Sequence, residues 1–318
     1  MRKSSQYMLA ALAAAPLLLA CACAQAFNLG IVAFQMSSET HARVANAAAA
    51  EAKAKGWNVT LLNSEGSLPK NTEQIETLVN KKVDAIIVAM GKPVEAEAQL
   101  KQAKEHGIPV IGVMSGASPY MLFDIEDNEY KVGAESALYL LGQMGYQGGI
   151  LETRFEGNAG TRIRGKVLDA VLSENQAVKV VGAFSMARTQ SWQDDVRNGM
   201  RALIMQHTGQ FKGIWASFDG QAYIIDDLLQ QQGMKKGDVT LVSTDGGAET
   251  YRRIADPNSL ITATVMIPFE AMGKEAVDDL DRIVVQKQPK DSVTTGPYLF
   301  TNAVLVDKHN VRQFLTKQ

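Results

Sequence analysis

FNLGIVAFQMSSETHARVANAAAAEAKAKG, residues 27–56, contains the pattern that decides the fold. Residues 29–34 form an apolar run of strand length, 35–40 form a polar turn, and an Ala-rich helical segment follows and ends at Gly56. This order is typical of the first strand–helix unit of an α/β domain. Ligands of open parallel sheets bind outside the carboxyl ends of the strands, so we expect the turn to form one wall of a binding site.

The same turn excludes two nucleotide-binding motifs. A dinucleotide-binding Rossmann fold requires G-x-G-x-x-G here, and a P-loop requires G-x-x-x-x-G-K-[ST], because the backbone must approach phosphates closely. Residues 35–41 contain no glycine. The turn is therefore better suited to a small polar ligand that is held by side chains.

The first 26 residues are typical of a secretory signal peptide. Arg2 and Lys3 precede an apolar stretch over 8–20, and an A-x-A cleavage site ends at Ala26. The stretch is too short and wrongly flanked to be a stable membrane span. We therefore predict export to the periplasm, with cleavage after Ala26.

A lipoprotein route is the alternative. Residues 18–21, LLAC, resemble a bacterial lipobox, in which Cys21 would be lipidated. Only five residues would separate Cys21 from Phe27, a short tether for a lipid-anchored domain, so we favour soluble processing. Because Cys21 and Cys23 both lie in the leader, the mature chain has no cysteine, which excludes disulfides and thiol catalysis.

Length and charge set further bounds. Removal of 26 residues from 318 leaves 292, enough for one large domain or two lobes with a sizeable core. Without Arg2 and Lys3, 30 basic residues stand against 34 acidic ones, a net charge of −4. The charges are interspersed and form no basic run, so we expect no nucleic-acid partner.

Strand-length apolar runs alternate with helical patterns along the rest of the chain. This alternation predicts βαβ units and parallel sheets, and the number of strands exceeds one small sheet. We therefore predict an α/β fold of two doubly wound parallel-sheet lobes. The predicted strands lie at 58–62, 83–88, 109–113, 148–152, 178–184, 213–216, 239–242 and 261–265, and the predicted helices at 71–80, 94–106, 131–144, 160–173, 191–206, 220–232 and 269–286.

Two stretches suggest lobe boundaries. Residues 123–128, FDIEDN, form a short polarised strand that leads into a new helix after the first group of strands. Residues 287–291, KQPKD, contain proline and lysine and are typical of a connector.

The chain from Phe27 to Gln318 resembles the type I periplasmic solute-binding proteins of sugar ABC importers, in their ribose-binding branch. The patterns that carry the resemblance occur in the family's order and spacing. They are LGIVAFQMSSETHARVANAAAAEAKAKGW (29–57), VDAIIVAM (83–90), IPVIGVMSG (108–116), DIEDNEYKVG (124–133), NAGTRIRGKVLDAV (158–171), SWQDDVRNGMRALI (191–204), IWASFDGQA (214–222), LVSTDGGAE (241–249) and ATVMIPFEAMGKEAV (263–277).

The resemblance implies two lobes joined by three hinge crossings that close on a small ligand. By that pattern, 27–128 plus 267–292 form the first lobe, and 129–266 plus 293–318 form the second. It also implies a sugar or polyol ligand, an ABC permease partner in the inner membrane, and a monomer.

The resemblance also assigns ligand-binding positions. Asp127 falls at the first crossing, Arg162 is similar to the position whose guanidinium clasps sugar hydroxyls, and Asp245 resembles the acidic group at the end of a second-lobe strand. Trp192 falls at or next to an aromatic position, and Phe218 occupies a position that is often Asn in relatives. Such charged groups suit hydroxyls, because their hydrogen bonds contribute roughly 1.5–3 kcal/mol each.

The sequence departs from the family's pattern at three places. Thr40 and His41 stand where relatives carry aromatic residues that sandwich a pyranose ring. Residues 114–115, Met-Ser, replace an Asp-Arg pair, and Met266 or Ile267 replaces a glutamine near the last crossing. These departures favour a linear polyol or an unusual sugar over ribose or galactose.

Most of the candidate ligand-binding residues have an ordinary structural alternative, and His41 could simply point to solvent. Asp127 and Asp219 could cap the helices that follow them, and Ser38 could be the N-cap of the first helix. Arg162 could be a solvated helix arginine and Asp245 a turn residue, and the aromatic candidates could belong to the core. The candidates are Phe34, Ser38, His41, Met114, Asp127, Arg162, Trp192, Phe218, Asp245 and Met266.

Catalytic and metal-binding motifs are absent from the sequence. The four histidines show no H-x-x-x-H or H-E-x-x-H spacing, and there is no G-x-S-x-G elbow. We therefore predict a binding protein without enzyme activity or cofactor. The sequence leaves open a sensor that presents its ligand to a chemoreceptor or histidine kinase, and a non-sugar solute. A LacI-type repressor would need a helix-turn-helix where the signal peptide stands.

Overall fold

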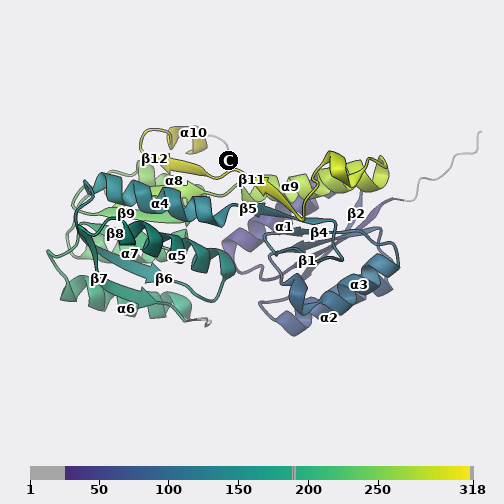
Figure 1. The fold of residues 1–318 in the computed structure, drawn as a ribbon, viewed down its shortest axis with the longest axis horizontal. Coiled ribbons are helices and arrows are strands. Elements are labelled where there is room, and N and C mark those ends of the chain that lie inside the picture. The colour runs from purple at the N-terminus through teal and green to yellow at the C-terminus, as the bar shows by residue number, and fades with distance from the viewer. Residues whose placement is uncertain (1–25, 188, 190, 316–318) are drawn as a thin grey trace, which may run out of the picture.

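Two six-stranded sheets divide the chain into two lobes, which lie side by side along the long axis of the molecule (Figure 1). The computed structural model describes residues 26–187, 189 and 191–315. The predicted signal peptide, with the lipidation alternative at Cys21, lies outside these described residues except for Ala26. The predicted class, α/β with two doubly wound lobes, is confirmed.

The first lobe has helices on both faces of its sheet. Its elements are β1 (Asn28–Ala33), α1 (Glu39–Ala54), β2 (Asn58–Asn63), α2 (Leu68–Asn80), β3 (Ala85–Ala89), the 3-10 helix η1 (Pro93–Glu95), α3 (Glu97–Glu105), β4 (Val110–Val113), β5 (Phe123–Asp127), α9 (Phe269–Leu280), the π-helical turn η2 (Asp281–Val285), the 3-10 helix η3 (Lys290–Ser292) and β11 (Tyr298–Thr301).

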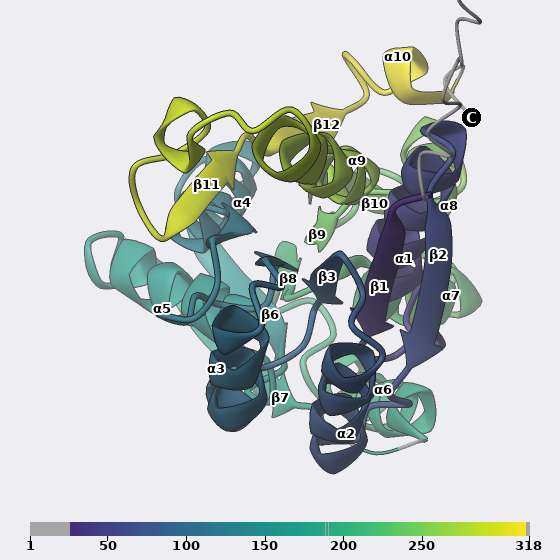
Figure 2. The same cartoon turned by 90° about the vertical axis from the view of Figure 1, so that its right-hand side faces the viewer.

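The strand order in this sheet is β11-β5-β4-β3-β1-β2, with all neighbours parallel. α2 and α3 pack on one face through Leu78 and Leu100, and α1 and α9 pack on the other through Val44 and Met272 (Figure 2). The central strands therefore read as continuous apolar runs rather than as alternating ones, as parallel sheets covered on both faces do.

The second lobe repeats this plan. Its elements are α4 (Glu129–Gln143), β6 (Gly148–Arg154), α5 (Ala159–Ser173), β7 (Val178–Ser185), α6 (Trp192–Gln206), β8 (Gly213–Ala216), α7 (Asp219–Gln231), β9 (Thr240–Asp245), α8 (Ala248–Ala255), β10 (Ile261–Met266), β12 (Val304–Asp307) and α10 (Arg312–Leu315).

The strand order in the second sheet is β12-β10-β9-β8-β6-β7. α4 and α5 cover one face around the buried Trp215, and α6, α7 and α8 cover the other around Ile214 and Leu241. β12 runs antiparallel to β10, whereas the other strand pairs of this sheet within the described residues are parallel.

Three crossings join the lobes, as predicted. The chain leaves the first lobe after β5, returns after β10 to form α9, and leaves again between β11 and β12. The third crossing lies later than expected, since 293–318 had been assigned to the second lobe but β11 pairs with β5 in the first sheet. Only residues 302–303 separate β11 from β12, so composition marks no boundary there.

Local differences from the predicted elements have simple causes. Gly107 and Gly233 end α3 and α7 with φ of 70° and 79°, as expected of glycine at a helix end. The helix predicted over 269–286 is α-helical only to Leu280 and continues as η2. α8 was not predicted; it is only eight residues long and directly follows two glycines.

No helix within the described part of the chain is both long and apolar enough to cross a membrane.

Candidate functional site

The carboxyl ends of the two sheets face each other. Arg43 on α1 of the first lobe donates a hydrogen bond to the Gly246 carbonyl, directly after β9 of the second. A Cβ on Gly247 would lie 2.9 Å from Glu39 Oε1, so the start of α1 touches the same loop. We call the carboxyl ends of β1, β3, β4 and β5 the first-lobe edge, and those of β6, β8, β9 and β10 the second-lobe edge. This is where a ligand of parallel sheets is expected.

A buried charge network organises the second-lobe edge. Arg164 on α5 donates to both carboxylate oxygens of Glu129 at 2.5 and 3.0 Å, and to Asp245 Oδ1 at 3.1 Å. The Arg164 and Glu129 side chains are only 4% and 6% exposed. Arg164 also donates to Ser217 O and Thr244 Oγ1, which ties α5 to the ends of β8 and β9. The network therefore fixes where Asp245 stands.

The backbone around Asp245 is held in an unusual conformation. Asp245 has φ of 117°, in a region that L-residues rarely adopt, and Gly246 follows with φ of 71°. Ile267 N donates to Asp245 O at 2.9 Å and Gly246 N donates to Asp219 Oδ2 at 2.8 Å. These bonds hold the strained turn in place, a feature that often marks functional sites.

Asp219 does not cap its own helix, which was the sequence expectation. Phe218 occupies the N-cap position of α7, and no side-chain cap forms there. The buried Asp219 carboxylate instead accepts hydrogen bonds from Ser243, Thr250 and Thr264, as well as from Gly246 N. Asp219 is thus a positioning residue for the 245–247 turn, a role that only tertiary contacts reveal.

The charges and burial at the second-lobe edge allow Asp245 to change its protonation state near neutral pH. Burial raises the pKa of Asp245 to about 7, against the opposing charge of Arg164 and with help from Asp219 and Glu129. Although burial disfavours a charged guanidinium, Glu129 and Asp245 keep the pKa of Arg164 above its usual value. The second-lobe edge therefore contains a permanent cation and an acid that can titrate near neutrality.

Asp127 lies at the end of β5, at the first crossing. It is 2% exposed, and Oδ1 accepts from Asn128 N at 2.8 Å. Asn128, not Asp127, caps α4 by accepting from Lys131 N, so the capping alternative does not apply. Oδ2 is buried without a hydrogen-bond partner among the described residues, and burial raises the pKa of Asp127 to about 6. The carboxylate thus has a free acceptor at the lobe junction.

Arg162 and Arg164 have different surroundings despite being two residues apart. Arg162 is half-buried in the first turn of α5, and its guanidinium donates to the Glu156 and Asn158 carbonyls at 2.9 and 3.4 Å. It is therefore at the second-lobe edge but outside the Asp245 network. The resemblance pointed to Arg162, and the role of Arg164 was missed, because only its burial against Glu129 and Asp245 distinguishes it.

Aromatic rings border the same edge. Trp192 begins α6, and its ring centroid lies 5.5 Å from that of Phe218, which precedes α7. Phe155, at the end of β6, packs edge-on against Phe218 at 6.4 Å. All three are half-buried against the second-lobe core. The structure brings the two predicted aromatics together and adds Phe155, whose place after an apolar strand was the available signal.

The predicted residues of the first-lobe edge lie after β1 and β4. Phe34 is buried, and its ring centroid lies 6.0 Å from that of His41 in the first turn of α1. Ser38 occupies the N-cap position without a side-chain cap, and its hydroxyl lies 3.4 Å from Thr40 Oγ1. Met114 follows β4 directly and is half-buried. These four predicted residues include no carboxylate or guanidinium, unlike Asp245 and Arg162 of the second-lobe edge.

Met266 belongs to the second-lobe edge. It is the last residue of β10 and stands beside Asp245 in the sheet register. Its Cβ and Cγ are 2.7 and 2.6 Å from where a Cβ on Gly246 would lie, so Gly246 has no room for a side chain. Met266 therefore helps to pack the turn that presents Asp245.

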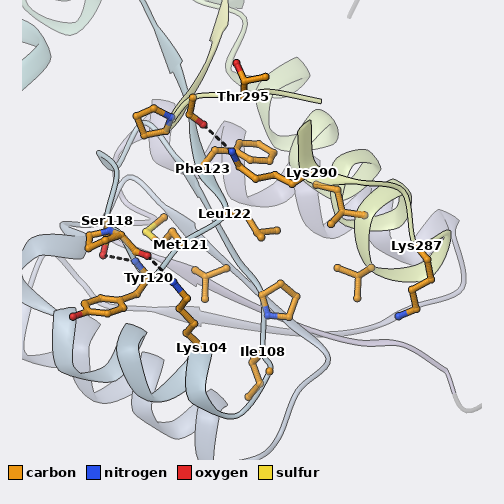
Figure 3. A pocket seen from close by; sticks show the side chains of 18 residues that line it. Lys104, Ile108, Ser118, Tyr120, Met121, Leu122, Phe123, Lys287, Lys290 and Thr295 are labelled. Carbon is orange, nitrogen blue, oxygen red and sulfur yellow. Dashed lines mark hydrogen bonds between the residues drawn. The ribbon is translucent and has the colours of Figure 1, made fainter. Parts of the chain in front are cut away.

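A separate surface hollow lies on the opposite edge of the first sheet. It has a volume of about 660 Å³ and is lined mainly by residues around the starts of β4, β5 and β11, among them Tyr120 and Leu122 (Figure 3). Lys104 and Lys290 donate to the Pro119 and Gly296 carbonyls at 3.1 Å each, so their ammonium groups are already paired. Because this is the amino-terminal edge, the hollow is not our candidate site.

No group of three or more His, Cys, Asp or Glu side chains within residues 26–187, 189 and 191–315 has an arrangement that could hold a metal ion.

Comparisons with known proteins agree with this geometry. The family described as periplasmic binding protein domain matches residues 29–288. The chain is 27% identical over 201 residues to a xylitol-binding protein of Mycolicibacterium smegmatis, a match that spans 61% of this chain and 55% of that relative. It is 26% identical over 288 residues to a D-apiose import binding protein of Paraburkholderia graminis, with 89% of each protein covered.

Among solved structures, an ABC sugar transporter subunit from Rhodobacter sphaeroides 2.4.1 is similar, with a TM-score of 0.76 and 25% identity. The similarity covers 89% of this chain and 99% of that one. The family match extends over most of the chain and both lobes, as the sequence patterns predicted. The chain therefore belongs to the periplasmic binding protein domain family.

Proposed function

We propose that this protein is the periplasmic substrate-binding component of an ABC importer, and that it captures a sugar or sugar alcohol between its two lobes. The observation that carries the proposal is the Arg164-held Asp245 at the second-lobe edge, together with the partly unpaired Asp127 carboxylate at the first crossing. Relatives named for binding xylitol and importing D-apiose support the ligand class. The proposed role is binding and delivery, without enzyme activity.

The chemistry of the site suits a neutral polyhydroxylated ligand. Each ligand hydroxyl must find a partner when buried, since an unpaired polar group costs about 1–3 kcal/mol in proteins. Asp245 and Asp127 would accept hydroxyl protons, and Arg162 would donate once it turns from its carbonyl partners. Trp192 and Phe218 would cover the apolar carbon face of the ligand.

Hinge closure provides the proposed mechanism. Ligand that contacts both edges stabilises the closed arrangement, because only that arrangement makes both sets of contacts. Arg43 supports this coupling: Glu270 holds its guanidinium at 2.6 and 2.9 Å while it reaches across to the Asp245 turn. The closed, monomeric form would then dock on an inner-membrane permease and release its ligand there.

A thermal-shift screen of residues 27–318 against sugars, polyols, amino acids and nucleosides tests the proposal. A ligand that binds only the folded state adds about 2.7 kcal/mol at 100 times its Kd, which raises the Tm by a few degrees. We expect hits among sugars or polyols, and a loss of the shift in Arg162→Ala and Asp245→Asn. Arg252→Ala is the matched control, since Arg252 is exposed and pairs only locally with Glu249.

The opposite pattern would overturn the proposal. Hits only among amino acids or nucleosides would keep the fold and discard the ligand class. A sugar hit that survives both site variants would place binding away from the facing edges.

A further inference from the structure

Three methionines stand in a row at the first-lobe edge. Met90 follows β3 directly, Met114 follows β4 directly, and Met36 follows β1 after two residues. β4, β3 and β1 are neighbours in the sheet, so the three residues are also neighbours along the edge. All three are half-buried and pack against the first-lobe core, so part of each remains exposed at the edge that faces the second lobe.

Their backbone places Met90 and Met114 in equivalent positions. Met90 N donates to Val113 O at 2.8 Å and Met114 N donates to Ile125 O at 2.9 Å, so both continue the sheet ladder by one residue. Both have a left-handed backbone, with φ of 57° and 51°. Glycine or asparagine adopts that conformation more readily, yet the chain places a long thioether at both sites.

The polar groups beside these methionines are already used within the first lobe. Ser115 Oγ donates to Val88 O at 2.8 Å and accepts from Gly91 N at 3.1 Å. Asn63 Oδ1 accepts from the Met36 and Glu65 amides at 3.1 Å each. The three methionines therefore form a thioether patch at the ends of β3 and β4 and beyond β1, beside the polar turn of residues 35–41. Such a patch is a soft and polarisable lining that suits apolar groups.

The second-lobe edge differs, since it carries the Arg164–Asp245 ion pair and the Trp192–Phe218 pair of aromatic rings. A ligand with both hydroxyls and an apolar group would match this arrangement, since its hydroxyls would bond to the acids and its apolar group would contact the methionines. We propose that the physiological ligand is a deoxy sugar or deoxy sugar alcohol, whose terminal methyl group lies against Met36, Met90 and Met114. This inference rests on the proposed function and narrows its ligand class.

Matched pairs of compounds test the inference. Calorimetric titration of residues 27–318 would compare L-rhamnose with L-mannose, L-fucose with L-galactose, and 5-deoxy-D-ribose with D-ribose, each pair differing by one terminal hydroxyl. An apolar pocket rejects an added hydroxyl by about 100-fold at most. We expect the deoxy member of at least one pair to bind between about 10-fold and 100-fold more tightly, within that limit.

The outcomes separate the inference from the proposed function. If sugars bind but the hydroxylated member of every binding pair is equal or better, the inference is wrong and the proposed function stands. If no sugar or polyol binds, both fail.

Variants of the methionines provide the second test. The double variant Met90→Gln, Met114→Gln should reduce the deoxy preference to less than about twofold, because the amides would pair with the extra hydroxyl. Met114→Leu keeps an apolar group of similar volume and should retain the preference. Met205→Gln is the control, since Met205 is 65% exposed on α6. If the double variant keeps its Tm and its preference for the deoxy sugar is unchanged, the terminal methyl group of the ligand does not contact Met90 and Met114.

Discussion

The first-lobe edge and the second-lobe edge are built from equivalent strand ends, but their buried acidic side chains are paired in different ways. At the second-lobe edge, Asp245 is buried with a charge partner, because Arg164 bridges it to Glu129. At the first-lobe edge, the Asp124 and Glu126 carboxyls are hydrogen-bonded to each other, and no lysine or arginine of the described residues pairs with either. Three methionines complete that edge. Equivalent strand ends can therefore become a charged wall or an apolar one.

This difference teaches that a parallel sheet fixes the place of a site and not its chemistry. The residue just after each strand is free to vary, because the strand interior supplies the stability. One edge would orient a ligand through directional bonds, and the other would accept it by shape and polarisability.

Removal of Arg164 should break the second-lobe edge most severely. Arg164→Ala leaves the Glu129 and Asp245 carboxylates buried without their cation, which costs about 3–5 kcal/mol in unfolding free energy. Urea denaturation measures this loss. Arg162→Ala, two residues away and half-buried with only carbonyl partners among the described residues, should stay within about 0.5 kcal/mol. Equal losses in both variants would show that the network does not support the lobe.

Asp245 should matter for affinity more than for folding. Asp245→Asn removes an ionised acceptor, so sugar or polyol affinity should fall by about 1.5–3 kcal/mol, roughly 10-fold to 150-fold. Calorimetric titration with a ligand from the screen measures this fall. Asp227→Asn is the matched control, because Asp227 on α7 pairs with Arg253 on α8 and not with Arg164. Unchanged affinity in Asp245→Asn would show that the Asp245 carboxylate does not bind the ligand.

Acidification should weaken binding without weakening the fold. Burial raises the pKa of Asp245 to about 7 and that of Asp127 to about 6. As the pH falls from 8 to 5, both carboxylates gain protons and stop accepting ligand hydroxyls, so affinity should fall. The folded state holds these protons more tightly than the unfolded chain, so the contribution of both groups to stability is largest at low pH and is lost as the pH rises through 6 and 7. As the pH falls, the affinity measured by titration calorimetry should therefore decrease, while the unfolding free energy measured by urea denaturation should increase. A decrease in both quantities would contradict the assignment.

The smallest effect is expected at the first-lobe acid pair. Burial and the neighbouring Asp124 raise the pKa of Glu126 to about 10, so it is protonated at neutral pH. Glu126→Gln keeps a donor to Asp124 and should change the unfolding free energy by less than about 0.5 kcal/mol. A loss of several kcal/mol in denaturation experiments would mean that Glu126 is charged in the native state.

The fold could largely be predicted from the sequence, because buried parallel strands and their helices have distinct periods. β11 and β12 were not predicted as strands, and β11 was placed in the wrong lobe, since hydrogen-bonding partners and not composition decide where an edge strand pairs. Family resemblance located Asp127 and Asp245 at the facing edges. Arg164 and Asp219 were missed as positioning residues, because a buried arginine and a solvated one look alike until packing separates them.

Methyl NMR with ¹³C-labelled methionine tests the central claim most directly. The chain would be titrated with whichever sugar or polyol of the screen binds it. The account predicts shifted methyl signals for Met36, Met90 and Met114 at the first-lobe edge and for Met266 opposite, with Met205 on α6 unchanged. Saturable binding that leaves those four methyl signals in place would contradict a ligand site between the two edges.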